Sequence, residues 1–209
     1  MKEQLVKAAI MESAAGLFSR LGYEKTSVDL IARNAGKSKA SVYYHYDSKL
    51  SIFRDVIKEE FRILRRRLEA VREEHCDKVA ECLSCYLMAR MEEMQKMAVY
   101  INCVRESFSH NMADGEPGDT LKAEREEFYL WETRYFLSVG ETGLKTGVLN
   151  DRVYPEMFAS MMVNLLKGLE IRFFLTSDSQ SFRSTYEAIV ELLIYRNPKL
   201  NAAGVTVSR

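Results

Sequence analysis

Lysine, hydroxyl and aromatic side chains that suit contact with phosphates and bases gather between residues 26 and 49, in the stretch TSVDLIARNAGKSKASVYYHYDSK. Residues 37–49 contain three lysines and one aspartate, which gives this segment a local charge of +2. Lysine and hydroxyl groups bind DNA phosphates and set register, whereas side chains near the start of a recognition helix reach base edges. The stretch therefore predicts contact with duplex DNA.

Short helices around a glycine-bearing turn are predicted to hold these side chains. An apolar face predicts the first helix, with members at Ile10, Ala14, Leu17, Phe18 and Leu21. Gly22 is in the usual position to end it. Thr26 is expected to cap a second helix, closed by Gly36, and Ser38 to cap a third. Two such helices separated by a turn are typical of a helix-turn-helix.

In order, spacing and residue type, about the first 55 to 60 residues resemble the DNA-binding domain of the tetracycline-repressor (TetR) family. The matching positions are Phe18, Gly22, Tyr23, Thr26, Ile31, Ala32, Ala35, Gly36, the run from Ser38 to Tyr46, Ser48, Lys49 and Phe53. Many members have glycine where Ala40 stands and phenylalanine where Tyr46 stands. The resemblance implies a three-helix DNA-binding domain, a six-helix effector-binding domain, a homodimer, and a ligand-responsive regulator that is most often a repressor.

In this register the expected DNA-binding residues are Thr26, Ser27, Lys37, Ser38, Lys39, Ala40, Ser41, Tyr43, Tyr44, His45 and Lys49. Lys49 is expected to bind a phosphate, and Thr26 both to cap its helix and to bind a phosphate. Two alternatives stay open, a core position for Tyr43 and an ordinary surface position for His45. Tyr46 is expected in the core, with a partner for its hydroxyl.

Helical spacing continues through the rest of the chain, so we predict an all-α fold of about nine helices in two domains, 1–48 and 49–209. A long helix of about 48–75, starting at Asp47 or Ser48, links them. Further helices are predicted at 77–97, 98–111, 121–139, 155–176 and 182–196. Pro117 and its neighbours predict a loop at 113–119, and Gly140, Gly143 and Gly147 are expected to end the helix before them.

The last two predicted helices carry apolar stripes too wide for a single contact. Their members are Phe158, Met161, Met162, Leu165, Gly168, Leu169, Tyr186, Ile189, Val190 and Leu193. Glycine in the middle of a helix is plausible where two helices approach closely. The resemblance implies that these helices pair with their symmetry mates as a four-helix bundle. An intramolecular core would use the same residues.

Large adaptable side chains with a few polar groups among them suggest an effector pocket within residues 77–139. The candidate effector-binding residues are Met88, Met91, Asn102, Arg105, Phe128, Trp131, Glu132 and Tyr135. The alternative for each apolar member is an ordinary core position. The expected effector is a largely hydrophobic small molecule with an anionic or polar end.

Other function classes are disfavoured by the sequence. No nucleophile elbow, P-loop or dinucleotide fingerprint occurs, and the three histidines have no metal spacing, so neither an enzyme nor a cofactor or metal site is expected. Cys82 and Cys85 lack a second ligand pair, which favours two small buried residues. The arginine run 65–67 suggests a solvated face, with contact to an effector or to the domain interface as the alternatives. No signal peptide or membrane span is apparent, which suggests a cytoplasmic protein.

Overall fold

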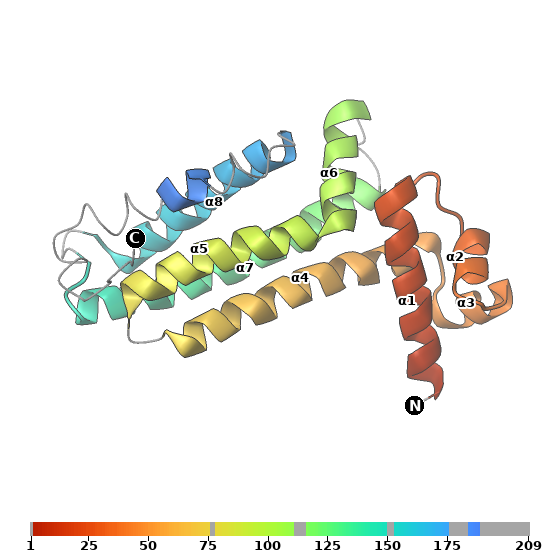
Figure 1. The fold of residues 1–209 in the computed structure, drawn as a ribbon, viewed down its shortest axis with the longest axis horizontal. Coiled ribbons are helices and arrows are strands. Elements are labelled where there is room, and N and C mark those ends of the chain that lie inside the picture. Colours follow the sequence, from red (N-terminus) through yellow and green to blue (C-terminus); the bar gives the residue numbers. More distant parts are fainter. Residues whose placement is uncertain (1, 76–77, 111–115, 150–152, 176–183, 189–209) are drawn as a thin grey trace. The chain divides into compact units, whose positions relative to one another are not determined.

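In the computed structural model, the described residues form helices and no strands, which confirms the all-α class. The described residues are 2–75, 78–110, 116–149, 153–175 and 184–188. The helices are α1 (Lys2–Leu21), α2 (Val28–Asn34), α3 (Lys39–His45), α4 (Lys49–Glu74), α5 (Val79–Lys96), α6 (Ala98–His110), α7 (Glu116–Lys145) and α8 (Pro155–Leu175), and residues 184–188 are helical as well (Figure 1).

The chain divides into two compact units. The first unit consists of Met1–Ile63 and Met97–Arg125, and the second of Leu64–Lys96 and Glu126–Arg209. Helices α4 and α7 therefore each contribute to both units, and α6 groups with the three N-terminal helices. The domain boundary expected from the sequence lies near residue 48, at the end of the N-terminal motif. The boundary between the compact units lies instead in the middle of α4.

Three aromatic rings form the centre of the N-terminal core in the first unit. Phe18 packs edge-on against Phe53 with ring centroids 5.4 Å apart, and Tyr23 lies 4.9 Å from Phe53. Ile31 of α2 and Val42 of α3 are fully buried. Aromatic pairs in these geometries stabilise beyond the area that they bury. The packing thus holds α2 and α3 on a rigid base formed by α1 and α4.

Gly22 ends α1 in a backbone conformation that side chains disfavour. Its φ is +78°, and its N–H donates to the carbonyl oxygen of Phe18 at 3.0 Å. A Cβ added at this position would lie 2.3 Å from Oε1 of Glu106 on α6. Since that atom is the end of a flexible side chain, the positive φ is the main reason for glycine here.

We expect Gly22→Ala to lower the free energy of unfolding by about 1–2 kcal/mol, because alanine is strained at positive φ. Gly16→Ala is the matched control. Gly16 lies inside the same helix with nothing within 4 Å of an added Cβ, so alanine there should stabilise by up to about 1 kcal/mol. Urea denaturation measures both changes, and equal effects of the two variants would contradict this account of the turn.

Helix α6 is fastened to the N-terminal helices by polar contacts within the first unit. The Glu60 carboxylate of α4 accepts the main-chain N–H groups of Val99 and Tyr100, at 3.1 and 2.9 Å. The Asn102 side chain donates to the main-chain oxygen of Ser19 at the end of α1. Burial raises the pKa of Glu60 to about 7, although both amides favour its charged form. The start of α6 is therefore fixed to α4, and its next turn to α1.

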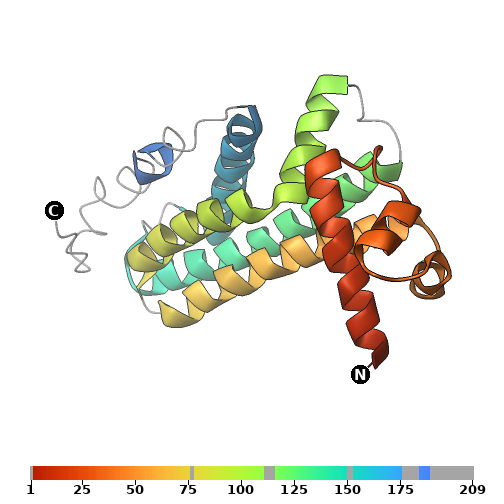
Figure 2. The ribbon, with the colours of Figure 1, turned by 45° about the vertical axis from the view of Figure 1, so that its right-hand side comes forward.

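The second unit packs α5, α7 and α8 with the second half of α4, and both ribbon views show α5, α7 and α4 running side by side (Figures 1 and 2). Arg65 pairs with Glu127 at 3.1 Å, and Arg72 donates to Ser138 at 2.9 Å. These contacts fix the later turns of α4 to α7. The three arginines of the run 65–67 therefore differ in their surroundings. Arg65 contacts α7, whereas the next two side chains are exposed.

Two helix boundaries differ from the expectation. Pro117 was expected in a loop but lies in the first turn of α7, where the missing N–H of proline has no helical partner to lose. Gly140 and Gly143 were expected to end that helix, yet it continues to Lys145. Added Cβ atoms there would lie 3.1 Å from Pro155 and 2.7 Å from Leu149, so close packing explains both glycines. Gly147, with φ +71°, follows the helix end as expected.

Candidate nucleic-acid interface

Helix α3 places one apolar side chain inward and the others outward. Ser38 caps it, since its hydroxyl accepts the N–H of Ser41 at 3.1 Å. Val42 is fully buried, whereas Tyr43 and Tyr44 are 47% and 76% exposed. The exposed tyrosines exclude a core position for Tyr43 within this chain. The helix therefore presents a polar, aromatic face on a fixed base.

The cap of α2 differs from the expectation. Ser27 caps α2, because its hydroxyl accepts the N–H of Leu30 at 3.2 Å. Thr26 is instead 1% exposed and donates its hydroxyl to the carbonyl oxygen of Gly22 at 2.8 Å. The expected capping role of Thr26 was therefore wrong by one residue, because its side chain closes the preceding turn. Because threonine and serine both carry a hydroxyl that can cap a helix, the sequence alone does not distinguish these two adjacent residues.

Two of the expected basic residues already have partners within the unit. Lys39 pairs with Asp29 of α2 at 3.0 Å, and this hydrogen bond raises the pKa of its amino group. Lys49 donates to the carbonyl oxygen of Tyr23 at 2.9 Å and lies 4.0 Å from the centroid of that ring. Burial lowers the pKa of Lys49. An ammonium has three hydrogens, so one bond to Tyr23 leaves Lys49 further donors for a phosphate.

The other expected residues around α3 differ in exposure. Lys37, Lys39 and Ala40 are exposed, and Ser41 is half-buried. His45 is half-buried, with its ring 5.0 Å from that of Tyr44. Tyr46 is 5% exposed, as expected for a core residue. The accessible part of the set is thus concentrated on α3 and on the turn before it.

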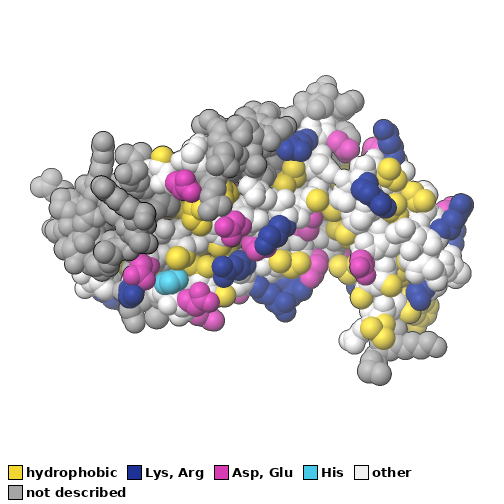
Figure 3. Space-filling model, viewed as in Figure 1, with side chains coloured by type: hydrophobic (Ala, Val, Ile, Leu, Met, Phe, Trp, Pro, Cys, Tyr) yellow, Lys and Arg dark blue, Asp and Glu magenta, His cyan; other side chains and the backbone are white. Residues whose placement is uncertain are grey.

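Charge is mixed over the face of the molecule drawn in Figure 3, where Lys and Arg side chains alternate with Asp and Glu. This agrees with a formal net charge of zero for the whole sequence. An interface with DNA therefore depends on the local arrangement around α3, and not on bulk charge.

The expected effector-binding residues fall into both units. Met91, Phe128, Glu132 and Tyr135 are buried in the second unit, and Met88 and Trp131 are half-buried there. Asn102 and Arg105 belong to the first unit, where Asn102 binds the end of α1. The expected residues of α5 and α7 thus lie in one unit, and the two residues of α6 belong to the other.

The expected dimer residues also divide by exposure. Phe158, Met162, Leu169 and Tyr186 are buried within the chain, and Leu165 is half-buried. Met161 is 54% exposed and Gly168 is exposed, with nothing near an added Cβ. Ile189, Val190 and Leu193 lie outside the described residues. Met157 is 44% exposed as well. We call the exposed side of α8 that carries Met157, Met161 and Gly168 its open face.

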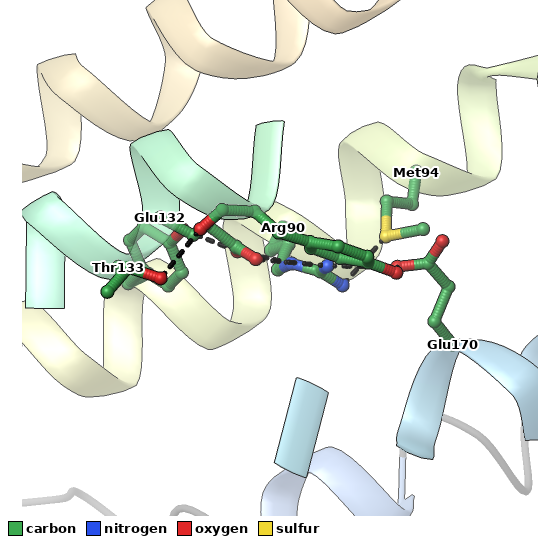
Figure 4. Close-up of polar contacts among 7 residues, drawn as sticks. Arg90, Met94, Glu132, Thr133 and Glu170 are labelled. Atoms are coloured by element: carbon green, nitrogen blue, oxygen red, sulfur yellow. Dashed lines mark hydrogen bonds and ion pairs between the residues drawn. The ribbon is translucent and has the colours of Figure 1, made fainter. Parts of the chain in front are cut away.

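A buried ionic cluster in the second unit was missed by the sequence reasoning, apart from Glu132. Arg90 of α5 is 0% exposed, and its Nε donates to Glu132 Oε1 at 2.7 Å. Its Nη2 donates to Glu170 of α8 at 3.1 Å (Figure 4). Tyr86 donates to Glu132 at 2.7 Å. The available signal was a charge at an apolar helix position, because Arg90 continues the face of Leu83 and Tyr86 at helical spacing.

Other candidate chemistry is not supported in the part of the chain that the structure describes. No group of three or more His, Cys, Asp or Glu side chains placed to hold a metal occurs there. Cys82 is buried with its sulfur 3.4 Å from the Tyr135 hydroxyl, whereas Cys85 is only half-buried. None of the described helices combines the length and apolar character needed to cross a bilayer.

The fold and the exposed α3 define a helix-turn-helix protein with a second helical unit. Residues 10–56 match the family model of bacterial regulatory proteins of the tetR family. The negative transcriptional regulator of the biofilm operon icaADBC, IcaR, is 45% identical over 53 residues in Staphylococcus aureus, which is 25% of this chain and 28% of that protein. Its Staphylococcus epidermidis counterpart is 41% identical over 56 residues, or 27% and 30% of the two chains. The match thus spans less than a third of these relatives.

Solved structures extend the likeness of fold along most of the chain. A TetR transcription regulator from Haloarcula marismortui has a TM-score of 0.72 at 18% identity, over 90% of this chain and 96% of that one. The fatty acid degradation regulator FadR from Bacillus halodurans has a TM-score of 0.67 at 13% identity, over 90% and 94%. Residues 10–56 thus resemble the N-terminal domain of the TetR family, and the fold of the chain is similar to that of these solved regulators.

Proposed function

We propose that this protein is a sequence-specific DNA-binding transcriptional repressor that acts as a homodimer and leaves its operator when a small hydrophobic or amphipathic effector binds. The observation that carries the proposal is the outward face of α3, which Ser38 caps and Val42 anchors, with Tyr43 and Tyr44 exposed beside it. The staphylococcal relatives matched over this segment are negative regulators, which favours repression. A DNA partner also agrees with the expectation of a cytoplasmic protein.

The direct test is a mobility-shift and footprinting experiment on the DNA around the gene of the protein. A repressor is expected to protect a short site with two related halves, because each recognition helix of a dimer reads one half. An enzyme or a scaffold protein of the same fold would leave the DNA unprotected at concentrations where the protein is dimeric. That outcome would overturn the proposal.

Operator binding is expected to weaken steeply with salt. Lys37, Lys39 and Lys49 provide three cationic groups per subunit near α3, and each neutralised phosphate contributes about −0.9 to the slope of log K against log salt. A dimer that uses all six should show a slope of about −5. Lys37→Ala removes two of these contacts and should reduce the slope by about 2. A slope that does not change in that variant would show that Lys37 does not contact phosphate.

Effector binding is assigned to the second unit, where most of the expected residues lie. Trp131 and Tyr135 of α7 face arginines of α4, since Arg65 lies 5.8 Å from the Trp131 ring and Arg72 lies 6.0 Å from the Tyr135 ring. A ligand that moves either ring would therefore act on α4, the helix that continues into the DNA-binding unit. For release, the ligand must bind the non-DNA-binding conformation better, by about 5.5 kcal/mol for a shift from 1:99 to 99:1.

A further inference from the structure

The buried guanidinium of Arg90 has acceptors of unequal quality. Arg90 lies between Glu132 on one side and Met94 and Glu170 on the other (Figure 4). Its Nε and Nη2 donate to carboxylate oxygens at 2.7 and 3.1 Å. Its Nη1 instead donates to the thioether sulfur of Met94 at 2.8 Å. The hydroxyl of Tyr186 is a further neutral partner of the same side chain.

A thioether is a weak acceptor for a charged donor in a fully buried place. Burial opposes the charge of Arg90, but the carboxylates of Glu132 and Glu170 raise the pKa of its guanidinium well above its usual value. The side chain therefore stays charged, and hydrogen bonds from a charged donor are roughly twice as strong as neutral ones. A hydrogen bond from Nη1 to an oxygen acceptor would therefore be stronger than its hydrogen bond to the sulfur of Met94.

The surroundings of Nη1 suit an apolar molecule. The ring of Phe128 lies 5.7 Å from the guanidinium, and Phe128 in turn stacks on Trp131 with centroids 5.5 Å apart. Met94 is 4% exposed, and its unbranched side chain has three rotatable bonds, so it moves aside more easily than a branched residue. Among the acceptors of Arg90, its sulfur is thus the one that a ligand oxygen would most easily replace.

We propose that Nη1 of Arg90 anchors the effector, and that the effector is an apolar molecule with an oxygen acceptor, such as a carbonyl or a carboxylate, which replaces the sulfur of Met94. The inference rests on the proposed function in that it calls the ligand an effector. Binding of the ligand to Arg90 does not itself depend on DNA. Because Glu132 and Glu170 already share the charge of Arg90, a neutral carbonyl is favoured over a carboxylate. A cationic headgroup has no acceptor to offer Nη1.

The test uses the purified full-length protein without DNA and three probes with the same eight-carbon chain: octanamide, octanoate and octylammonium. Isothermal titration calorimetry should show octanamide binding roughly 10- to 100-fold more tightly than octylammonium. The affinity of octanoate, compared with that of octanamide, shows whether an anionic or a neutral acceptor binds more tightly. Equal binding of octanamide and octylammonium, or tighter binding of octylammonium, would overturn the proposal.

Met94→Leu distinguishes an anchor from a merely structural contact. The exchange conserves volume and removes the sulfur, so the ligand-free protein should melt about 2–4 °C lower. Octanamide should nevertheless bind about five-fold more tightly, because the thioether no longer competes for Nη1. Leu83→Met, a reverse exchange at a buried position of the same helix, is the control and should change octanamide affinity little. Weaker or unchanged octanamide binding in Met94→Leu would overturn the assignment.

Failure of this inference is distinguishable from failure of the proposed function. Footprinting with the same preparation reports operator binding, and calorimetry reports the probes. A protein that binds octanamide at Nη1 but protects no DNA would retain the inferred site and lose the proposed function. A protein that protects its operator but does not discriminate among the three probes would retain the function and lose the site.

Discussion

Replacing Arg90 by methionine is expected to lower the free energy of unfolding by about 3–5 kcal/mol, because it leaves two buried carboxylates without their shared cation. Glu132 is 0% exposed and Glu170 is 4% exposed, so water does not reach them to compensate. Methionine keeps an unbranched stem but lacks the two Nη groups of arginine, so the space that they leave adds a cavity cost. Chemical denaturation near neutral pH measures the change.

Lys96→Met is the control for the Arg90 variant. Lys96 lies near the end of the same helix and pairs with Glu93 at the surface, where such contacts contribute little. Its loss should change stability by no more than about 0.5 kcal/mol. If Arg90→Met is as mild as Lys96→Met, the cluster is not the buried ionic centre described above.

Gly168→Glu is expected to weaken operator affinity by about 10²–10⁴-fold, because a monomer loses the gain from two linked half-site contacts. Gly168 lies on the open face of α8 with Met161, and an added Cβ meets nothing within 4 Å. The substitution therefore fits the isolated chain, and it would place a charge in the dimer contact that we propose for α8. The expected product is a folded monomer.

Light scattering and operator titration together test the Gly168 variant. Gln95→Glu, an exposed change of the same kind on α5, should leave both the dimer and its DNA affinity intact. A Gly168→Glu protein that remains dimeric would place the dimer contact elsewhere, for example on the half-buried Leu165 or outside α8.

The helix-turn-helix segment could be predicted in detail because its determinants are local. Caps, a C-terminal glycine and helical spacing all lie within a few residues of the structure that they specify, and Ser38, Gly22 and Val42 behave accordingly. The error at Thr26 was a choice between two adjacent hydroxyl residues, and only the geometry of the preceding turn decides it.

The second unit was less predictable because its determinants lie far apart in the sequence. Gly140 continues a helix since Pro155 of α8 packs against it, and no local signal reports that partner. Arg90 becomes buried only because Glu132 and Glu170 meet it, 42 and 80 residues away. A charge on an apolar helix face was visible in the sequence, but its partners were not.

Selection of genomic DNA fragments by the purified protein tests most directly the central claim that the surface around α3 reads a specific operator. The wild-type protein should enrich a short, two-fold symmetric site. Lys49→Ala should enrich the same site less strongly, because phosphate contacts carry no base information. Tyr44→Ala should change which site is preferred, since a good base contact discriminates by about 1–3 kcal/mol. Wild-type selection that enriches no symmetric site would contradict the account.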